Sequence, residues 1–241
     1  MKALAPRLIA LPGTLLDGRS LQALLQGLDA HTELLGTAPH IDDEVDRLAR
    51  LAGDGAAVWL GHSLGGIVAL HLALRHPHRV TALVLLGANA RAGRDSSPTR
   101  RDAQWALAQQ QGLAALAHSK LAPGYGMAED DVALAGLVAQ AQAVGLQRFA
   151  HQLAYAQQRP GLLAPRQTIR LPVLAISGEL DSLCPPEQSD EIVALVASPW
   201  PAMHNRLPGA GHLFPMQQAA MAAAHLHPFL ARLATLKEPC P

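Results

Sequence analysis

Six short apolar runs recur along the chain, and each has the length of a buried β-strand. Helical patterns separate most of them. The strand candidates span residues 8–11, 32–35, 56–60, 80–86, 172–176 and 203–207, and the helix candidates span residues 20–28, 41–51, 64–75, 187–195 and 215–233. Nearly continuous aliphatic strands that alternate with helices are typical of a parallel sheet covered on both faces. The sequence therefore predicts an α/β fold with a mostly parallel sheet of about six strands.

One long interval, residues 90–168, lacks a strand pattern. It is rich in alanine, glutamine and leucine, and prolines such as Pro123 and Pro160 mark the ends of its segments. Alanine and glutamine favour helix, and prolines end helices. We therefore predict a helical insertion at residues 90–168, within an α/β core made of residues 1–89 and 169–241.

Composition and charge exclude several classes of partner. The 241 residues include 19 basic and 19 acidic ones, so the net charge attracts the chain neither to nucleic acid nor to an anionic membrane. No apolar run approaches the roughly 18 residues of a membrane span, and the first apolar residues read as a strand, not a signal peptide. Cys184 and Cys240 are too few for a disulfide framework and lack metal-ligand spacing. We expect one cytoplasmic protein that needs no metal and no organic cofactor.

The stretch WLGHSLGGIV, residues 59–68, places Ser63 at the corner between a predicted strand and a predicted helix. Such a corner holds its central residue in a strained backbone conformation, and side chains at Gly61 and Gly65 would collide there. The serine hydroxyl then lies at the carboxyl edge of the sheet, where open α/β sheets bind ligands. The amide of Leu64, at the start of the helix, points to the same space and suits an oxyanion. In this context the G-x-S-x-G pattern favours a nucleophile over an ordinary turn.

A serine hydroxyl needs a histidine base and a carboxylate that orients the base. Of the 12 histidines, His212 follows the last predicted strand in LPGAGHLFP, a loop that we expect above Ser63. Asp181 follows the preceding strand in VLAISGELDSLCPP, at the same edge of the sheet. The chain order Ser63, Asp181, His212 is that of α/β-hydrolases. These three residues form the predicted catalytic triad.

The chain resembles the α/β-hydrolase superfamily and, within it, the small bacterial esterases related to pimeloyl-ACP methyl ester carboxylesterase. The similar stretches are LIALPGTLLDGRSL, WLGHSLGGIVALHLALRHPHRVTALVLLGANAR, LPVLAISGELDSLCPP and LPGAGHLFPMQ, which span the chain outside the insertion. The resemblance implies Ser63 as nucleophile, His212 as base and Asp181 as its partner. It also implies that the insertion occupies the position of the family's lid.

The chain departs from the family pattern after its first strand. Members usually carry His-Gly there, and the next residue donates the second oxyanion amide. This chain has Pro12 and Gly13, so Thr14 inherits that role by position. The alternative is that LPGT forms only a turn, but an acyl-transfer site needs a second donor.

The expected reaction is hydrolysis of a small-molecule carboxylic ester through an acyl-enzyme. We predict a mostly apolar pocket, with walls formed by the insertion and by Leu15, His62, Leu183 and Leu213. An excess of basic residues in and beside the insertion would suit an acidic acyl carrier protein, as the resemblance implies, or would simply form a solvated surface. These residues include Arg91, Arg94, Arg100, Arg101, Arg148, Arg159, Arg166 and Arg170.

Other activities stay open with the same triad, namely those of a thioesterase, a C–C bond hydrolase, a lactonase or a perhydrolase. Epoxide hydrolases and dehalogenases of this fold use an aspartate nucleophile, so Ser63 disfavours them. The alternative from another class is a relative that binds a small molecule without catalysis, because a fold alone does not guarantee a function.

Overall fold

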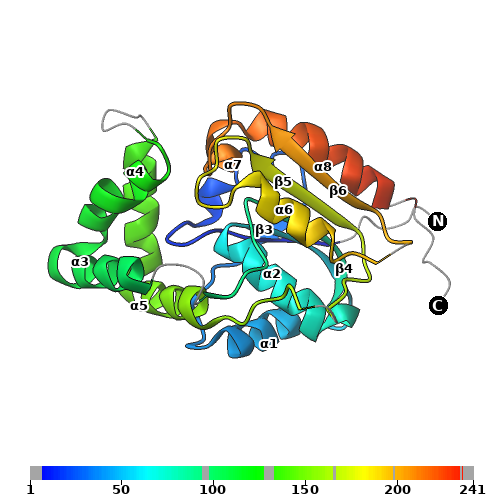
Figure 1. The fold of residues 1–241 in the computed structure, drawn as a ribbon, viewed down its shortest axis with the longest axis horizontal. Helices are drawn as coiled ribbons and strands as arrows, with labels where there is room; N and C mark the ends of the chain where they lie inside the picture. The colour runs from blue at the N-terminus through cyan, green and yellow to red at the C-terminus, as the bar shows by residue number, and fades with distance from the viewer. Residues whose placement is uncertain are drawn as a thin grey trace.

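The computed structural model describes residues 7–93, 98–127, 133–164, 167–197, 199–233 and 235 (Figure 1). Its six strands form one sheet in the order β2-β1-β3-β4-β5-β6, and every neighbouring pair is parallel. The strands are β1 (Leu8–Leu11), β2 (Ala30–Thr32), β3 (Ala57–His62), β4 (Val80–Leu86), β5 (Val173–Gly178) and β6 (Ala202–Leu207). The predicted parallel sheet is confirmed. Arg94, Arg166 and Cys240 lie outside the described residues.

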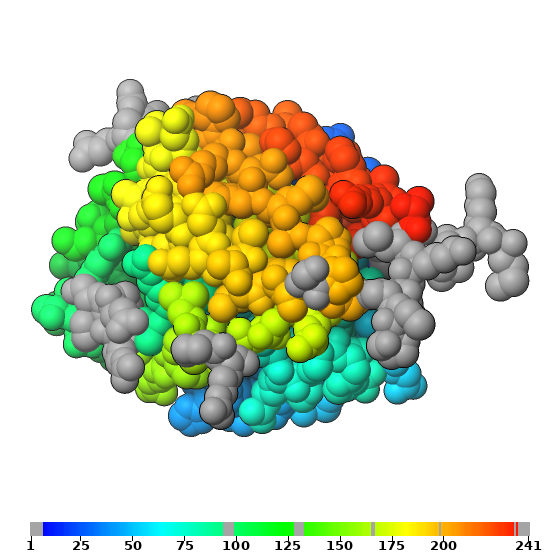
Figure 2. All heavy atoms as spheres, turned by 45° about the vertical axis from the view of Figure 1, so that its right-hand side comes forward, coloured from blue at the N-terminus to red at the C-terminus, as the bar shows by residue number. Residues whose placement is uncertain are grey.

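Helices connect the strands and cover both faces of the sheet (Figure 1). Those of the α/β core are α1 (Ile41–Leu51), α2 (Leu64–Arg75), α6 (Pro186–Val193), α7 (Phe214–Gln217) and α8 (Ala219–Leu233), with short 3-10 turns η1 (Gly18–Ser20) and η2 (Pro77–Arg79). In Figure 2, α6, β6 and α8, coloured yellow to red, form one continuous outer surface. Within the described ranges, no helix combines the length and the apolarity that crossing a bilayer would require.

Two predicted elements differ from the structure. The segment 20–28 is not an α-helix: it forms consecutive turns, with one bond from the Leu25 amide to the Leu21 carbonyl (2.9 Å). Its leucines have helical spacing because they pack on the sheet, which does not require a complete helix. Strand β2 ends at Thr32, not Leu35, because the buried Leu35 packs from the loop that follows. Both errors come from reading a buried apolar position as a regular element.

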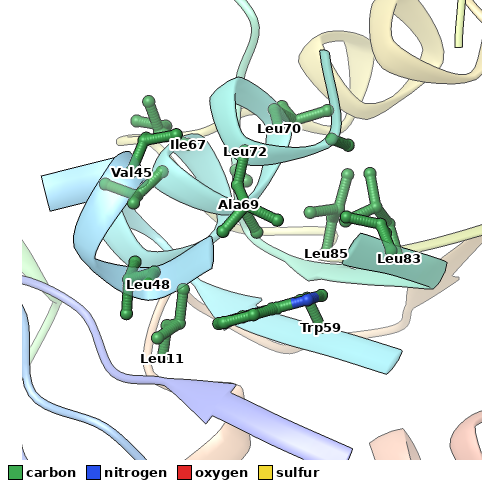
Figure 3. Packing of buried hydrophobic residues seen from close by; sticks show 14 of the residues in the cluster. Leu11, Val45, Leu48, Trp59, Ile67, Ala69, Leu70, Leu72, Leu83 and Leu85 are labelled. Atoms are coloured by element: carbon green, nitrogen blue, oxygen red, sulfur yellow. The ribbon is translucent and has the colours of Figure 1, made fainter. Parts of the chain in front are cut away.

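The alternation of side chains along the strands builds two hydrophobic layers. Leu11, Trp59 and Leu85 pack on one face against α1 and α2 (Figure 3). On the other face, Val58 of β3 and Phe229 of α8 belong to the second hydrophobic layer. Successive residues of a strand point to opposite faces, so a continuous apolar run is required when both faces are covered. This accounts for the aliphatic strands of the sequence.

The insertion between β4 and β5 is helical, as predicted. It comprises α3 (Pro98–Leu116), the π-helical turn η4 (Ala117–Leu121), α4 (Ala122–Gly124) and α5 (Leu134–Gln158). It has a hydrophobic cluster of its own, which also includes Leu15 and Leu213 of the core. Figure 1 shows these helices as a lobe beside the sheet. Leu15 and Leu213 therefore join the lobe to the α/β core.

Buried His71 on α2 makes stability depend on pH. Burial, together with the nearby positive charge of Arg159, lowers the pKa of His71 to about 4. The unfolded chain takes up a proton near pH 6.5 and the native state does not, so acidification from pH 8 to pH 5 lowers the unfolding free energy by about 2 kcal/mol through this residue. We expect His71→Gln to reduce this loss by that amount. Urea unfolding at the two pH values measures it.

The matched control for this prediction is His227→Gln, because His227 is exposed on α8. It should lose as much stability on acidification as the wild type does. An equal loss in His71→Gln would mean that His71 ionises as readily in the native state as in the unfolded chain.

Candidate active site

Ser63 occupies the turn between β3 and α2 in a conformation that few residues adopt. Its φ and ψ are 52° and −117°, and its amide donates to the Leu86 carbonyl (2.8 Å). A Cβ atom at Gly61 would lie 2.4 Å from the backbone of Gly65, and one at Gly65 would lie 2.1 Å from the Leu11 carbonyl oxygen. These two positions therefore have no room for a side chain, as the sequence predicted. The strain at Ser63 is held by close packing of the strand, the turn and the helix.

This packing predicts that Gly65→Ala destabilises the fold strongly. The new methyl group would meet backbone atoms of β1, which cannot rotate away as a side chain can. We expect the free energy of unfolding to fall by about 3 kcal/mol, which urea titration measures. Gly136→Ala in α5 is the control, because a Cβ atom there meets nothing within 4 Å. It should leave stability unchanged or raise it by up to about 1 kcal/mol.

Asp181 and His212 form a buried hydrogen-bonded pair on the loops that follow β5 and β6. His212 Nδ1 lies 2.7 Å from Asp181 Oδ2, and both residues are almost fully buried. The other carboxylate oxygen, Oδ1, accepts from the amides of Leu183 and Cys184, each at 2.9 Å. Because an ionised carboxylate only accepts hydrogen bonds, Nδ1 carries the proton of the neutral imidazole. The lone pair of His212 is therefore on Nε2.

Ser63 and His212 line the same cavity, of about 240 Å³. Within the described part of the chain, no hydrogen bond joins the Ser63 hydroxyl to the His212 ring. Such bonds are often long in unliganded enzymes and shorten when substrate binds. With Nδ1 bound to Asp181, Nε2 is the ring atom available to the cavity and to the hydroxyl.

Thr14 and Leu64, the two predicted oxyanion donors, lie at the same cavity. Both residues line the cavity beside Ser63. Neither amide donates a hydrogen bond to another described residue, whereas the neighbouring Leu15 amide donates to Gln152 Oε1 (3.0 Å). Leu15 has a positive φ of 56°, so the chain turns sharply directly after Thr14. Two amides that lack an internal acceptor are thus left beside the hydroxyl.

His62 lies beneath the cavity rather than in its wall. Its Nε2 donates to the His212 carbonyl (3.0 Å), and the centroids of the two rings are 5.0 Å apart. Burial lowers the pKa of His62 to about 3, and the nearby His212 adds to this effect, so the ring stays neutral. With Nε2 as the donor, the lone pair of the His62 ring is on Nδ1, which has no hydrogen-bond partner among the described residues, the Ser63 hydroxyl included.

The predicted pocket wall needs correction. Leu183 lines the cavity, but Leu15, His62 and Leu213 are fully buried and support the site from beneath. In their place Arg100, Arg101, Lys120 and Arg159 line the cavity, together with Asn89, Gln104 and Tyr125. Apolar side chains such as Ile67, Leu121 and Leu153 also line the cavity, so its wall combines the predicted apolar surface with cationic groups that the sequence did not indicate. Leu15 and Leu213 do not line it because they pack the insertion onto the core.

Two residues that support the site, Tyr125 and Gly87, are not among those predicted from the sequence. Tyr125 stacks on the His212 ring, with a centroid distance of 5.6 Å and an interplanar angle of 14°. Gly87 has φ 52°, and a Cβ atom there would lie 3.1 Å from Asp181 Oδ2 and 3.4 Å from His212 Nδ1. A glycine at the carboxyl end of β4 could have been recognised as a close approach. Nothing local marks Tyr125, because the insertion brings it to the site.

Cys184 also lines the cavity but is unsuited to be a nucleophile. Burial and the charge of Asp181 raise the pKa of its thiol to about 12, so the thiolate is scarce at neutral pH. Its amide binds Asp181 and its sulfur accepts from Asn89 Nδ2 (3.6 Å). The residue packs the acid loop.

The parallel sheet, the strained serine turn and the buried Asp181–His212 pair define an α/β-hydrolase architecture. The alpha/beta hydrolase fold family matches the chain over residues 29–219. The chain belongs to this family, which confirms the resemblance seen in the sequence.

A lipase and an esterase match shorter segments of the chain. Lipase LipV of Mycobacterium tuberculosis is 44% identical over 78 residues, which are 32% of this chain and 26% of the lipase. The pimeloyl-[acyl-carrier protein] methyl ester esterase of Vibrio parahaemolyticus is 34% identical over 95 residues, 35% of this chain and 37% of the esterase. The structure of a thermophilic esterase from Thermogutta terrifontis aligns with a TM-score of 0.79 at 18% identity, covering 97% of this chain and 92% of that one. At that identity the structural match shows a shared fold.

Proposed function

We propose that the protein is a serine hydrolase that cleaves a carboxylic ester through an acyl-enzyme. The observation that carries this proposal is the 2.7 Å contact between Asp181 and His212, which leaves Nε2 for the cavity that Ser63 also lines. The free amides of Thr14 and Leu64 supply the second requirement, donors for an oxyanion. The names of the matched lipase and esterase agree with ester cleavage.

The proposed reaction has two steps. His212 Nε2 takes the proton of Ser63 as Oγ attacks the ester carbonyl, and the amides of Thr14 and Leu64 bind the oxyanion. The protonated imidazole then gives this proton to the alkoxide, so that the alcohol leaves and an acyl-serine remains. Water, deprotonated by the same nitrogen, attacks the acyl carbonyl and releases the carboxylic acid and the free serine.

The insertion acts as a lid in this proposal. The insertion supplies more than half of the residues that line the cavity, and its Tyr125 rests on the His212 ring. Covering the site excludes water and strengthens electrostatic interactions with the reacting atoms. The triad chemistry itself requires no metal or organic cofactor.

That an acyl carrier protein is a partner of this protein stays a prediction. The matched Vibrio esterase is named for a substrate of this kind. Of the basic residues considered, however, Arg91 pairs with Glu191 (2.6 Å), Arg148 binds Thr37 Oγ1 (2.8 Å), and Arg159 is buried in the cavity wall. Fewer of them are therefore available as a docking surface than the sequence suggested.

A fluorophosphonate that carries a reporter group tests the nucleophile directly. We expect it to phosphonylate Ser63, with loss of fluoride and of the hydroxyl proton, and mass spectrometry should locate the added mass on the peptide containing residue 63. Pretreated enzyme should no longer release p-nitrophenol from acyl esters. An unlabelled protein that binds esters without turnover would contradict the proposal and support a non-catalytic relative. A parallel panel of esters and thioesters decides which bond is preferred.

A further inference from the structure

The cavity above Ser63 has an unusual charge pattern. Four cationic side chains line it, those of Arg100, Arg101, Lys120 and Arg159. Among the residues that the structure describes, no aspartate or glutamate lines it, since Asp181 lies behind His212. Four positive charges around one cavity create a positive potential that attracts an anionic ligand. The chain as a whole carries no net charge, so this local excess is not a consequence of composition.

Arg101 and Lys120 are the cations best placed to bind a ligand. Arg101, in α3, is half-buried and donates to the Gly93 carbonyl (3.2 Å). Burial lowers the pKa of Arg101, and the charge of Arg100, which lines the same cavity, lowers it further. Lys120, in η4, is exposed at the cavity and forms no ion pair within the described ranges.

Arg159 has a different role from these two. Its guanidinium donates to Asn89 Oδ1 (3.2 Å) and to the carbonyls of Arg91 (3.0 Å) and Ala156 (2.6 Å). These bonds fix the wall in which Asn89 contacts Cys184. Arg159 therefore adds positive potential to the cavity, while its guanidinium hydrogen bonds hold neighbouring segments of the cavity wall together.

The cationic cluster lies close to the catalytic groups. Arg100 Nη2 would lie 3.4 Å from a Cβ atom at Gly124, and the next residue, Tyr125, stacks on His212. The cavity that contains both has a volume of only about 240 Å³. The cations and Ser63 therefore line one cavity of small volume, which favours a compact ligand that contacts both.

We propose that this cavity binds a compact ester whose acyl chain ends in a free carboxylate, and that Arg101 and Lys120 bind the carboxylate while Ser63 attacks the ester carbonyl. This inference rests on the proposed esterase function and assigns its substrate class. Guanidinium and ammonium groups bind carboxylates with charge-assisted hydrogen bonds. Cations that line the cavity can contact a charge on the substrate itself, whereas a docked carrier protein would contact cations outside the cavity.

Matched pairs of esters test the inference. The monomethyl and dimethyl esters of succinate, glutarate and adipate differ within each pair only by the free carboxylate, and methanol release measures hydrolysis. We expect the wild type to prefer the monomethyl ester, at its best chain length, by about tenfold or more in kcat/KM. Arg101→Gln and Lys120→Gln should each reduce this preference by about tenfold. Arg50→Gln, an exposed arginine on α1, removes the same charge away from the cavity and should leave the preference unchanged.

A binding measurement separates this inference from the proposed function. Titration calorimetry of the wild type with succinate, glutarate and adipate requires no turnover, and we expect binding that weakens in Lys120→Gln and at high salt. Circular dichroism shows whether Arg101→Gln folds, and the exposed Lys120 provides a second variant if it does not.

Different results would overturn each part. If the enzyme hydrolyses both esters without preference and binds no dicarboxylate, the proposed carboxylate site is wrong, but the proposed esterase function still stands. If the protein binds dicarboxylates but hydrolyses no ester, the proposed esterase function is wrong, but the proposed carboxylate site still stands. Tighter binding of inorganic phosphate than of every dicarboxylate would overturn the assignment of the anion as a carboxylate.

Discussion

Ser63→Ala lowers kcat/KM for p-nitrophenyl acyl esters by about 10⁴- to 10⁶-fold, because no acyl-enzyme can form without Oγ. The remaining rate would come from water attacking an ester bound by the amides of Thr14 and Leu64. Steady-state kinetics on purified protein, with circular dichroism to confirm folding, measures the loss. Activity within tenfold of the wild type would remove Ser63 from the mechanism.

Ser63→Gly is the companion variant, because it separates the hydroxyl from the backbone strain. Both variants lack the nucleophile and should be equally inactive. At φ 52° and ψ −117° alanine keeps the strain of a Cβ atom and glycine does not, so the glycine variant should be more stable by about 1–2 kcal/mol. This is opposite to the usual order of alanine and glycine. If alanine were the more stable residue here, the turn would not be strained.

Several features could be predicted because short segments determine them. The G-x-S-x-G turn requires glycines that the structure shows against the backbones of Leu11 and Gly65. The positions of Asp181 and His212 after two successive strands predict that both lie at one sheet edge, and the structure joins them by a hydrogen bond. Parallel strands bring their carboxyl ends to the same edge, so this juxtaposition follows from topology.

The cationic part of the cavity wall could not be predicted, because it depends on how the insertion sits on the core. Leu15 and Leu213 have the composition of a pocket wall, but their contacts with the insertion bury them. Arg101 and Lys120 look like surface residues in the sequence, yet both line the cavity. Tyr125 reaches His212 only through the same packing. Contacts between segments so far apart along the chain have no local pattern.

Asp181→Asn lowers kcat by about 10⁴-fold at neutral pH, although it changes only one atom. In the wild type, Oδ1 accepts from the amides of Leu183 and Cys184, and Oδ2 faces His212 Nδ1. An asparagine must keep its carbonyl oxygen on those two amides, so its NH₂ group faces the imidazole. His212 then accepts at Nδ1 and carries its proton on Nε2, where it cannot take the proton of Ser63.

The control for this change is Glu179→Gln, two residues earlier on the same loop. Glu179 is exposed and accepts from the Gly209 amide (2.8 Å), a bond that the carbonyl oxygen of glutamine can keep. Removing this charge should leave kcat unchanged, because the carboxylate contacts neither the imidazole nor the cavity. Equal losses in the two variants would mean that Asp181 acts through loop structure or general electrostatics. A loss confined to Asp181→Asn means that one hydrogen bond sets the histidine tautomer, and with it the ability of Ser63 to react.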